Sequence, residues 1–298
     1  MADGRFAPSP TGDLHLGSLR TALAAWLFSR ANSGRFLIRM EDLDEGRVRE
    51  HHYTGQLEDL RALGLDWDGD PVRQSERIGL YDAALQQLAD AGLVYECWCT
   101  RAEIRVAPSA PHGDLPEGAY PGTCRDLSNG ERTARRASAR PPALRLRAGE
   151  AAVGFEDMLR GPVSGRVDDF ILRRGDGVIA YQLAVVVDDA EQKIDLVVRG
   201  TDLLDSTPRQ ILLARLLGHE RSTSFAHVPL VLGPDGTRLA KRHGAVTLAD
   251  RAERPEIVLS MLAASLGLAD PGEPVTTDQL LERFDPNRLP AEPWVLQA

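Results

Sequence analysis

The N-terminal part of the chain alternates between short apolar runs and one long helical segment, and this pattern constrains the fold most strongly. The run ending at Phe6-Ala7-Pro8 is typical of a short strand, and a loop rich in proline, glycine, threonine and serine follows it. An amphipathic helix is predicted from about residue 18 to residue 32, Gly34 ends it, and Phe36–Met40 has the composition of a buried strand. Two strands joined through a helix form a βαβ unit, which requires a parallel sheet. The sequence therefore predicts an α/β fold.

The same alternation returns later in the chain, after a long interruption. From Cys97 to about Pro142 the sequence is rich in proline and glycine and irregular, and it contains all three cysteines. A hairpin is predicted around the turn at residues 174–177. We therefore expect one nucleotide-binding sheet, interrupted by an insertion and followed by a helical tail. The other predicted elements are helices at about 47–63, 78–91, 208–217, 255–266 and 277–284, and strands at 194–198 and 225–232.

Charge is distributed unevenly along the chain. The net charge of −9 argues against general attraction to nucleic acid, because phosphate contacts need cations. The segment Arg125–Arg147 is an exception, with seven arginines against two acidic residues. This run fits either a solvated loop or an RNA-contacting surface, and both interpretations stay open.

The loop between the first strand and the first helix, Pro8–Ser18, has the composition of a phosphate-binding site. A helix that begins near Ser18 would direct free N–H groups and the positive end of its dipole towards the sheet edge. Gly12 and Gly17 would let a base or a phosphate approach the backbone closely. His15 could donate to a phosphate oxygen, although taken alone it is explained more simply as a helix-capping residue.

A second basic loop, Arg238–Gly244, has three cations within five residues. Such a loop can fold over a triphosphate and stabilise its departing half, whereas the alternative is a solvated basic turn. Of the 35 basic residues in the chain, only Lys193 and Lys241 are lysines. Because arginine does not replace the compact, strongly hydrated charge of lysine, Lys241 favours the functional interpretation.

These two loops resemble the "HIGH" and "KMSKS" signatures of the class I aminoacyl-tRNA synthetases. Other blocks resemble glutamyl-tRNA synthetases in the same order, over roughly Arg5 to Arg242, which makes the resemblance specific. It implies a Rossmann-like parallel sheet with an inserted zinc-bearing subdomain and a short helical C-terminal tail. The blocks are Arg5–Gly12, Arg39–Asp44, Tyr181–Ala184, Val198–Leu203 and Ser206–Gln210.

The resemblance also implies domain limits. Residues 1–95 and 180–240 would form the catalytic domain, and residues 96–179 an inserted zinc-binding, acceptor-like subdomain. Residues 241–298 would form a stem-like helical tail that is too short for an anticodon-binding domain.

Roles for individual residues follow from the same resemblance. Arg5, Tyr181 and Arg199 would hold the side-chain carboxylate of glutamate, since an arginine fork offers paired hydrogen bonds. Glu41 would take the α-ammonium group, helped by Ala7 and Ser9. The alternative is that Arg39–Glu41 and Arg199–Asp202 are only structural ion pairs. The residues expected at the ATP are His15, Gly17, Ser18 and Lys241, of which His15 and Lys241 would be catalytic.

The chain departs from the two signatures at three positions. Ser18 stands where the first signature has its second histidine, Arg238 where the second has its first lysine, and Ala240 where it has serine. Because His15 and Lys241 remain, we expect activation to be retained.

The three cysteines, Cys97, Cys99 and Cys124, lie within 28 residues. Such spacing in a cytoplasmic protein predicts a metal site rather than a disulfide, and a structural zinc takes four ligands. Chemistry alone would select His112 as the fourth ligand. The resemblance instead implies Tyr120, from a Tyr-x3-Cys pattern with Cys124.

A short glutamyl-type catalytic body with this insertion resembles the glutamyl-Q tRNA(Asp) synthetases. That resemblance implies ATP-dependent, tRNA-independent activation of L-glutamate with Mg²⁺, and transfer to queuosine at the wobble position of tRNA(Asp). The alternatives are a shortened glutamyl-tRNA synthetase that charges the tRNA 3′ end, and a non-catalytic synthetase-like protein that binds RNA or nucleotide. The lead of residues 1–4 is too short and too acidic for a secretory signal, and no apolar run is long enough to span a bilayer, so we expect a cytoplasmic protein without a membrane partner. We also expect a monomer.

Overall fold

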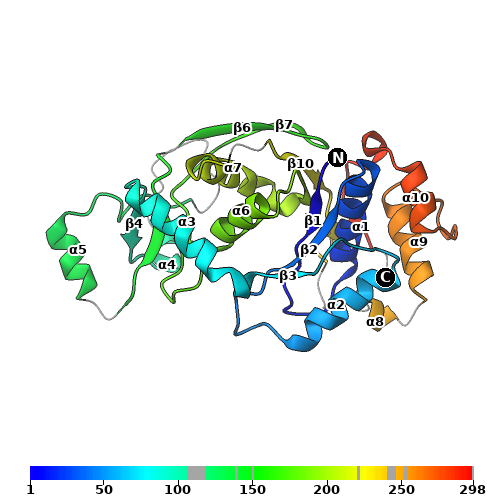
Figure 1. Ribbon diagram of the computed structural model, residues 1–298, viewed down its shortest axis with the longest axis horizontal. Helices are drawn as coiled ribbons and strands as arrows, with labels where there is room; N and C mark the ends of the chain where they lie inside the picture. The colour runs from blue at the N-terminus through cyan, green and yellow to red at the C-terminus, as the bar shows by residue number, and fades with distance from the viewer. Residues whose placement is uncertain are drawn as a thin grey trace.

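The computed structural model describes residues 1–106, 119–137, 140–149, 151–219, 222–239, 246–251 and 254–296. The molecule is elongated, with a large sheet and its helices in the middle (Figure 1). Helix α5 (Asn129–Arg136) lies at one end, and the C-terminal helices α9 (Pro255–Ser265) and α10 (Thr277–Arg283) lie at the other. Among the described residues, no helix combines the length and apolar character needed to span a membrane.

The main sheet has seven strands in the order β3-β2-β1-β9-β10-β6-β7. All neighbouring pairs are parallel except the last, in which β6 and β7 form an antiparallel hairpin. The predicted α/β fold with a parallel sheet is therefore confirmed. The strands are β1 (Gly4–Phe6), β2 (Phe36–Met40), β3 (Val72–Arg73), β6 (Ala152–Asp157), β7 (Gly161–Arg166), β9 (Leu196–Gly200) and β10 (Ser224–Val228).

The first helix, α1 (Leu16–Ala31), joins β1 to β2 as predicted, but it is not amphipathic in its surroundings. Eleven of its side chains are buried, because the sheet covers one side and α9 and α10 cover another. Phe28 of α1 meets the ring of Phe284 edge-on at 5.0 Å between centroids. At the sheet side, a Cβ on Gly4 would lie 2.2 Å from Ser29 Oγ, so β1 and α1 approach closely only because residue 4 is glycine.

Two predicted strands differ from the structure. The second strand of the hairpin predicted around residues 174–177 is reduced to a single bridge between Ile179 and Arg173, and helix α6 (Tyr181–Glu191) begins two residues later. The predicted strand at 225–232 is divided into β10 and β11 (Val231–Leu232), since Pro229 has no N–H to continue a ladder. Strand β11 pairs instead with β12 (Trp294–Val295), which attaches the end of the described chain to the main body.

The region predicted to be irregular, from Cys97 to about Pro142, contains two helices, α4 (Arg101–Val106) and α5. Strands that flank this region form a small antiparallel sheet in the order β4-β5-β8. Helix α5 has a Ser128–Glu131 capping box and no buried side chain. The arginine-rich run is thus divided between α5 and a packed part in which Arg125 pairs with Asp169 at 2.6 Å. The small sheet is formed by β4 (Val94–Cys97), β5 (Ala143–Leu146) and β8 (Ile171–Arg173).

The hairpin β6–β7 belongs to the main sheet although its residues fall within the predicted insertion at residues 96–179. Helices α6 and α7 lie near it (Figure 1), and α7 contacts both of its strands. The helices not yet described are α2 (Glu50–Ala62), α3 (Ile78–Asp90), α7 (Thr207–Leu216) and α8 (Leu248–Arg251), and the 3₁₀ turns are η1 (Gln74–Arg77), η2 (Thr201–Ser206) and η4 (Pro286–Arg288).

Candidate active site

A cavity of about 690 Å³ opens beyond the carboxyl ends of β1, β2 and β9. This is the usual position for a ligand in an open parallel sheet. The structure brings together there all of the predicted glutamate and ATP residues that it describes. They are Arg5, Ala7, Ser9, His15, Gly17, Ser18, Glu41, Tyr181 and Arg199. The tenth, Lys241, lies outside the described residues, as does Ala240.

Arg5 enters the cavity with its charge already paired. Its Nε and Nη2 donate to the two carboxylate oxygens of Asp189 on α6, at 3.1 and 3.3 Å. Arg39 of β2 is fully buried behind it and donates to the same carboxylate at 2.7 Å. Arg39 also lies 3.8 Å from Glu41, so the predicted structural pair exists but is longer than its contact with Asp189. Asp189 therefore holds the two arginines together.

Glu41 follows β2 directly, and its backbone N–H donates to the carbonyl of Pro8 at 2.8 Å. Burial raises the pKa of its carboxyl to about 7, although the nearby guanidinium groups of Arg39 and Arg5 favour the ionised form. The carboxylate is thus poorly solvated at the cavity wall. An ammonium group placed beside it would add a closer positive charge to the long contact with Arg39.

Arg199, at the end of β9, is surrounded by uncharged acceptors among the described residues. Its strongest hydrogen bonds are from Nη1 to Gln210 Oε1 at 2.7 Å and from Nη2 to Thr207 Oγ1 at 2.8 Å. Two further contacts, to the hydroxyl of Tyr181 and the carbonyl of Leu203, are both 3.4 Å long. Arg199 is only 5% exposed and burial lowers its pKa, so a buried cation faces the cavity with two replaceable contacts.

The alternative pair Arg199–Asp202 does not form among these contacts. Asp202 pairs instead with Arg238 at 2.7 Å, and both residues line the cavity. Arg238 is 62% exposed, so this ion pair is a solvated contact at the cavity wall. Arg238, which stands where the second signature has its first lysine, therefore lies at the cavity where the nucleotide is expected.

His15 is the N-cap residue of α1, as the simpler interpretation of the sequence predicted. It also lines the cavity. Its Nδ1 accepts from the backbone N–H of Ser18 at 3.1 Å, so the neutral ring carries its proton on Nε2. That nitrogen lies 3.3 Å from Ser18 Oγ. Burial lowers the pKa of His15, and the charge of Arg238 lowers it further. The ring therefore offers a neutral N–H donor.

The N-terminus of α1 offers fewer N–H groups than expected. It begins at Leu16 rather than Ser18, and the Leu16 N–H donates to the carbonyl of Val246 at 2.8 Å. A Cβ on Gly17 would lie 3.1 Å from the His15 ring. A side chain at position 17 would therefore press against the histidine ring, whereas Gly12 has no atom within 4 Å of such a Cβ.

Sequence reasoning missed the residues that support the site. Gln56 of α2 is 2% exposed and donates to the carbonyls of Ser9 and Gly12, which holds the signature loop. Asp189 also went unnoticed, because no helix was predicted between residues 181 and 191. Gln210 lies in a block that was matched but was given no role.

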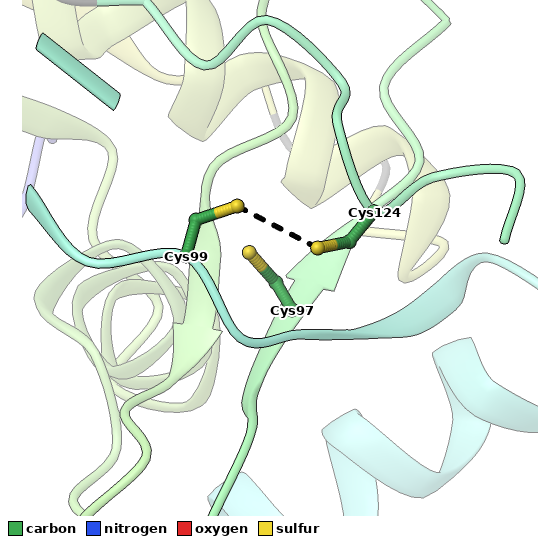
Figure 2. A group of neighbouring side chains, drawn as sticks. All are labelled: Cys97, Cys99 and Cys124. Carbon is green, nitrogen blue, oxygen red and sulfur yellow. Dashed lines mark hydrogen bonds between the residues drawn. The ribbon is translucent and has the colours of Figure 1, made fainter. Parts of the chain in front are cut away.

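The three cysteine sulfurs lie within 4.8 Å of one another. Their side chains point towards one another (Figure 2), and the Sγ atoms of Cys99 and Cys124 lie 3.6 Å apart. The hydroxyl of Tyr120 lies 3.3 Å from Cys97 Sγ and 3.7 Å from Cys99 Sγ. Tetrahedral zinc with bonds of about 2.3 Å to sulfur separates two sulfurs by about 3.8 Å, so the spacing fits. His112 lies outside the described residues.

Comparison with known proteins identifies the family. Residues 2–298 match the model of the catalytic domain of class I tRNA synthetases (E and Q). A glutamyl-Q tRNA(Asp) synthetase of Nocardia farcinica is 60% identical over 98% of this chain and 92% of its own length. One from Symbiobacterium thermophilum is 51% identical over 98% of this chain and 95% of its own length. The chain belongs to the glutamyl-Q tRNA(Asp) synthetase family. As a family member it is a ligase of the class I synthetase type.

Solved structures show the same fold for related glutamyl enzymes. A glutamate tRNA ligase from Elizabethkingia meningosepticum, in complex with its amino acid, is 30% identical with a TM-score of 0.82. The match covers 99% of this chain and 66% of that one. A glutamate-tRNA synthetase from Elizabethkingia anophelis is 31% identical with the same TM-score of 0.82, over 99% of this chain and 68% of the other. This family member therefore spans about two thirds of the length of those enzymes.

Proposed function

We propose that this chain activates L-glutamate with ATP, without requiring tRNA, and transfers the glutamyl group to queuosine at the wobble position of tRNA(Asp). The observation that carries the amino-acid assignment is the charge pattern of the cavity. Arg199, whose hydrogen-bond acceptors among the described residues are uncharged, brings a positive charge to one wall, and Glu41 brings a poorly solvated acid to another. A substrate with a distal carboxylate and an α-ammonium group complements both.

The selectivity for glutamate over glutamine depends on Arg199. Its acceptors are neutral, so the buried charge gains most from a ligand that carries an anion. The long contact with Tyr181 can be exchanged for a carboxylate oxygen, and the phenol can then donate to the same group. Arg5, whose charge is largely matched by Asp189, would add directional hydrogen bonds rather than charge.

Activation would occur where the glutamate residues meet the signature loop. The α-carboxylate attacks the α-phosphorus of ATP, the bond to the bridging oxygen breaks, and pyrophosphate leaves. His15, Gly17 and Ser18 would position the nucleotide, and the Nε2–H of His15 would donate to it. Lys241 would stabilise the departing phosphates. Mg²⁺, bound with ATP, supplies charge neutralisation at those phosphates.

In the transfer step, a hydroxyl of the cyclopentenediol ring of queuosine attacks the mixed anhydride. An ester forms, and AMP leaves with the electron pair of the broken C–O bond. The names of the relatives support this acceptor, since both matches extend over more than nine tenths of each chain.

We also propose a structural zinc held by Cys97, Cys99, Cys124 and Tyr120. The donor atoms are arranged as such a site requires, and the Tyr120 hydroxyl accepts the Cys124 N–H at 2.7 Å, which fixes its position. Burial raises the pKa of the Cys99 thiol to about 12, so a cation is needed to hold it as thiolate. The zinc would fix the loops around β4.

The test is ATP–pyrophosphate exchange with glutamate, glutamine or aspartate, each with and without tRNA. We expect exchange with glutamate alone and no requirement for RNA. Incubation with tRNA(Asp) that carries or lacks queuosine then separates this function from charging of the 3′ end. Equal glutamate transfer to the two tRNAs would support a shortened glutamyl-tRNA synthetase instead, and nucleotide binding without exchange would support a non-catalytic protein.

A further inference from the structure

Behind the cavity wall, three buried residues form a chain of hydrogen bonds that ends at Arg199. Asp157, at the end of β6, accepts from His227 Nδ1 of β10 at 2.6 Å. His227 Nε2 accepts from Arg199 Nε at 3.0 Å. Asp157 and His227 are 1% and 0% exposed, and neither lines the cavity. Only Arg199 can reach a substrate.

The chemistry of Arg199 fixes the protonation state of His227. A guanidinium Nε always carries a hydrogen and cannot accept one, so the imidazole nitrogen that faces it must have a free lone pair. The proton of the neutral ring is therefore on Nδ1, where the carboxylate of Asp157 receives it. The hydroxyl of Thr207 lies 3.2 Å from the same Nε2 and can also donate to it. A ring protonated on Nε2 would direct its N–H against the Nε–H of Arg199.

We propose that Asp157 and His227 are positioning residues for glutamate recognition, which hold Arg199 in the orientation that binds the distal carboxylate. This inference rests on the proposed function, because it assigns Arg199 to the substrate. The carboxylate of Asp157 selects the Nδ1–H form of His227, and that form presents an acceptor to Arg199. The Nη groups of Arg199 then face Tyr181 and the cavity rather than turning towards the imidazole.

The decisive variant is Asp157→Asn. Asp157 Oδ1 accepts the backbone N–H groups of Leu159 and Arg160, both at 3.0 Å, so an asparagine keeps its oxygen there. Its amide nitrogen then faces His227 Nδ1 and donates to it. The proton must move to Nε2, where it opposes Arg199 Nε–H. A buried donor without an acceptor is costly, so we expect the glutamate KM to rise about 10- to 100-fold with kcat within about 3-fold.

Three measurements distinguish positioning from a general loss of structure. The ¹⁵N–¹H signal of His227 should move from Nδ1 to Nε2 in Asp157→Asn. The double variant Asp157→Asn/His227→Gln should regain most of the lost affinity for glutamate, because a glutamine amide can turn its oxygen to Arg199. Asp169→Asn is the matched control: Asp169 is also fully buried and accepts from Tyr95 and Arg125, but it does not line the cavity. It should lower the melting temperature without changing the glutamate KM.

The proposal is overturned if Asp157→Asn keeps the wild-type KM, if its KM rises while the proton stays on Nδ1, or if the double variant regains nothing. A wild-type protein without glutamate-dependent exchange would contradict the proposed function instead. In that case the ¹⁵N measurement still decides whether Asp157 sets the tautomer of His227.

Discussion

Both carboxylate oxygens of Asp189, on α6, accept hydrogen bonds from the guanidinium group of Arg5, on β1, at 3.1 and 3.3 Å, although 184 residues separate the two in the sequence. The same carboxylate accepts a hydrogen bond from the fully buried Arg39 at 2.7 Å. One acidic side chain thereby joins β1, β2 and α6 beside the cavity that Arg5 lines. The position of Arg5 in the cavity depends on a helix that was not predicted.

Removal of this carboxylate should affect stability and binding together. In Asp189→Asn, Arg5 and Arg39 lose their shared counter-charge, and breaking a buried ion pair from one side costs about 3–5 kcal/mol of unfolding free energy. Urea unfolding measures that loss, and glutamate binding should weaken because Arg5 is no longer held. The exposed carboxylate of Glu50, which pairs with Arg73, supplies the control, since Glu50→Gln should leave the unfolding midpoint unchanged. A similar midpoint for the two variants would contradict the prediction.

The raised pKa of Glu41 predicts opposite effects of pH on binding and on stability. Burial raises this pKa from 4.5 to about 7, so the ionised form that attracts an ammonium is lost as pH falls through about 7. The glutamate KM should therefore rise below pH 7. The unfolded chain releases the proton near pH 4.5, so this group makes the fold less stable as pH rises from about 4.5 to about 7.

Glutamate KM and urea unfolding, each measured between pH 5 and pH 8.5, check these two directions. Glu41→Gln should raise the KM and remove its dependence on pH in this range. A KM that stays constant across pH 7 in the wild-type protein would show that Glu41 does not bind the ammonium group.

The two lysines of the chain form a matched pair for mutation. Lys241→Ala should reduce ATP–pyrophosphate exchange by about 10²- to 10³-fold with the fold intact, as expected for loss of one donor to a developing charge. Lys193→Ala should leave exchange unchanged, because Lys193 follows α6 and does not line the cavity. Circular dichroism would verify the fold, and near-normal exchange by Lys241→Ala would remove that lysine from the mechanism.

Zinc binding is tested by metal content and by competition with a chelator. Elemental analysis should find about one zinc per chain, as expected for a closed four-ligand site. Cys99→Ser should lose the metal, and Tyr120→Phe should release it at a lower chelator concentration than the wild-type protein does. Tyr95→Phe is a suitable comparison, since the Tyr95 hydroxyl donates to Asp169 rather than lying among the sulfurs. Equal zinc retention by Tyr120→Phe and the wild type would point to a different fourth ligand.

The local sequence pattern predicted an element correctly where the apolar periodicity and the residues that end a helix or strand indicate the same bounds. Strand β2 spans the predicted Phe36–Met40, and α3 ends one residue before its predicted end. Helix α6 was missed because Val185-Val186-Val187 favours a strand by propensity, whereas packing against α3 and α7 makes it a helix. Amphipathicity failed for α1 because helices far along the chain cover its outer side.

The site shows the same division. The residues that the matched blocks assign to glutamate and ATP all line one cavity, as far as they are described. The chain Asp157–His227–Arg199 could not be predicted, because it depends on β6 pairing beside β10 over 70 residues of separation. Of these three residues, the sequence indicated a role only for Arg199, because only Arg199 lies in a block that resembles the glutamyl-tRNA synthetases.

Arg20, near the start of α1, is linked to two segments that lie more than 200 residues later in the chain. It is 1% exposed and donates to the carbonyl of Pro229 at 2.7 Å and to Ser265 at 2.9 and 3.0 Å. Burial lowers its pKa to about 10, so it is still a cation at neutral pH. Helix α1, the exit of β10 and the last turn of α9 are therefore fastened at a single point. Any movement of α9 away from the nucleotide loop would therefore have to break these hydrogen bonds of Arg20 first.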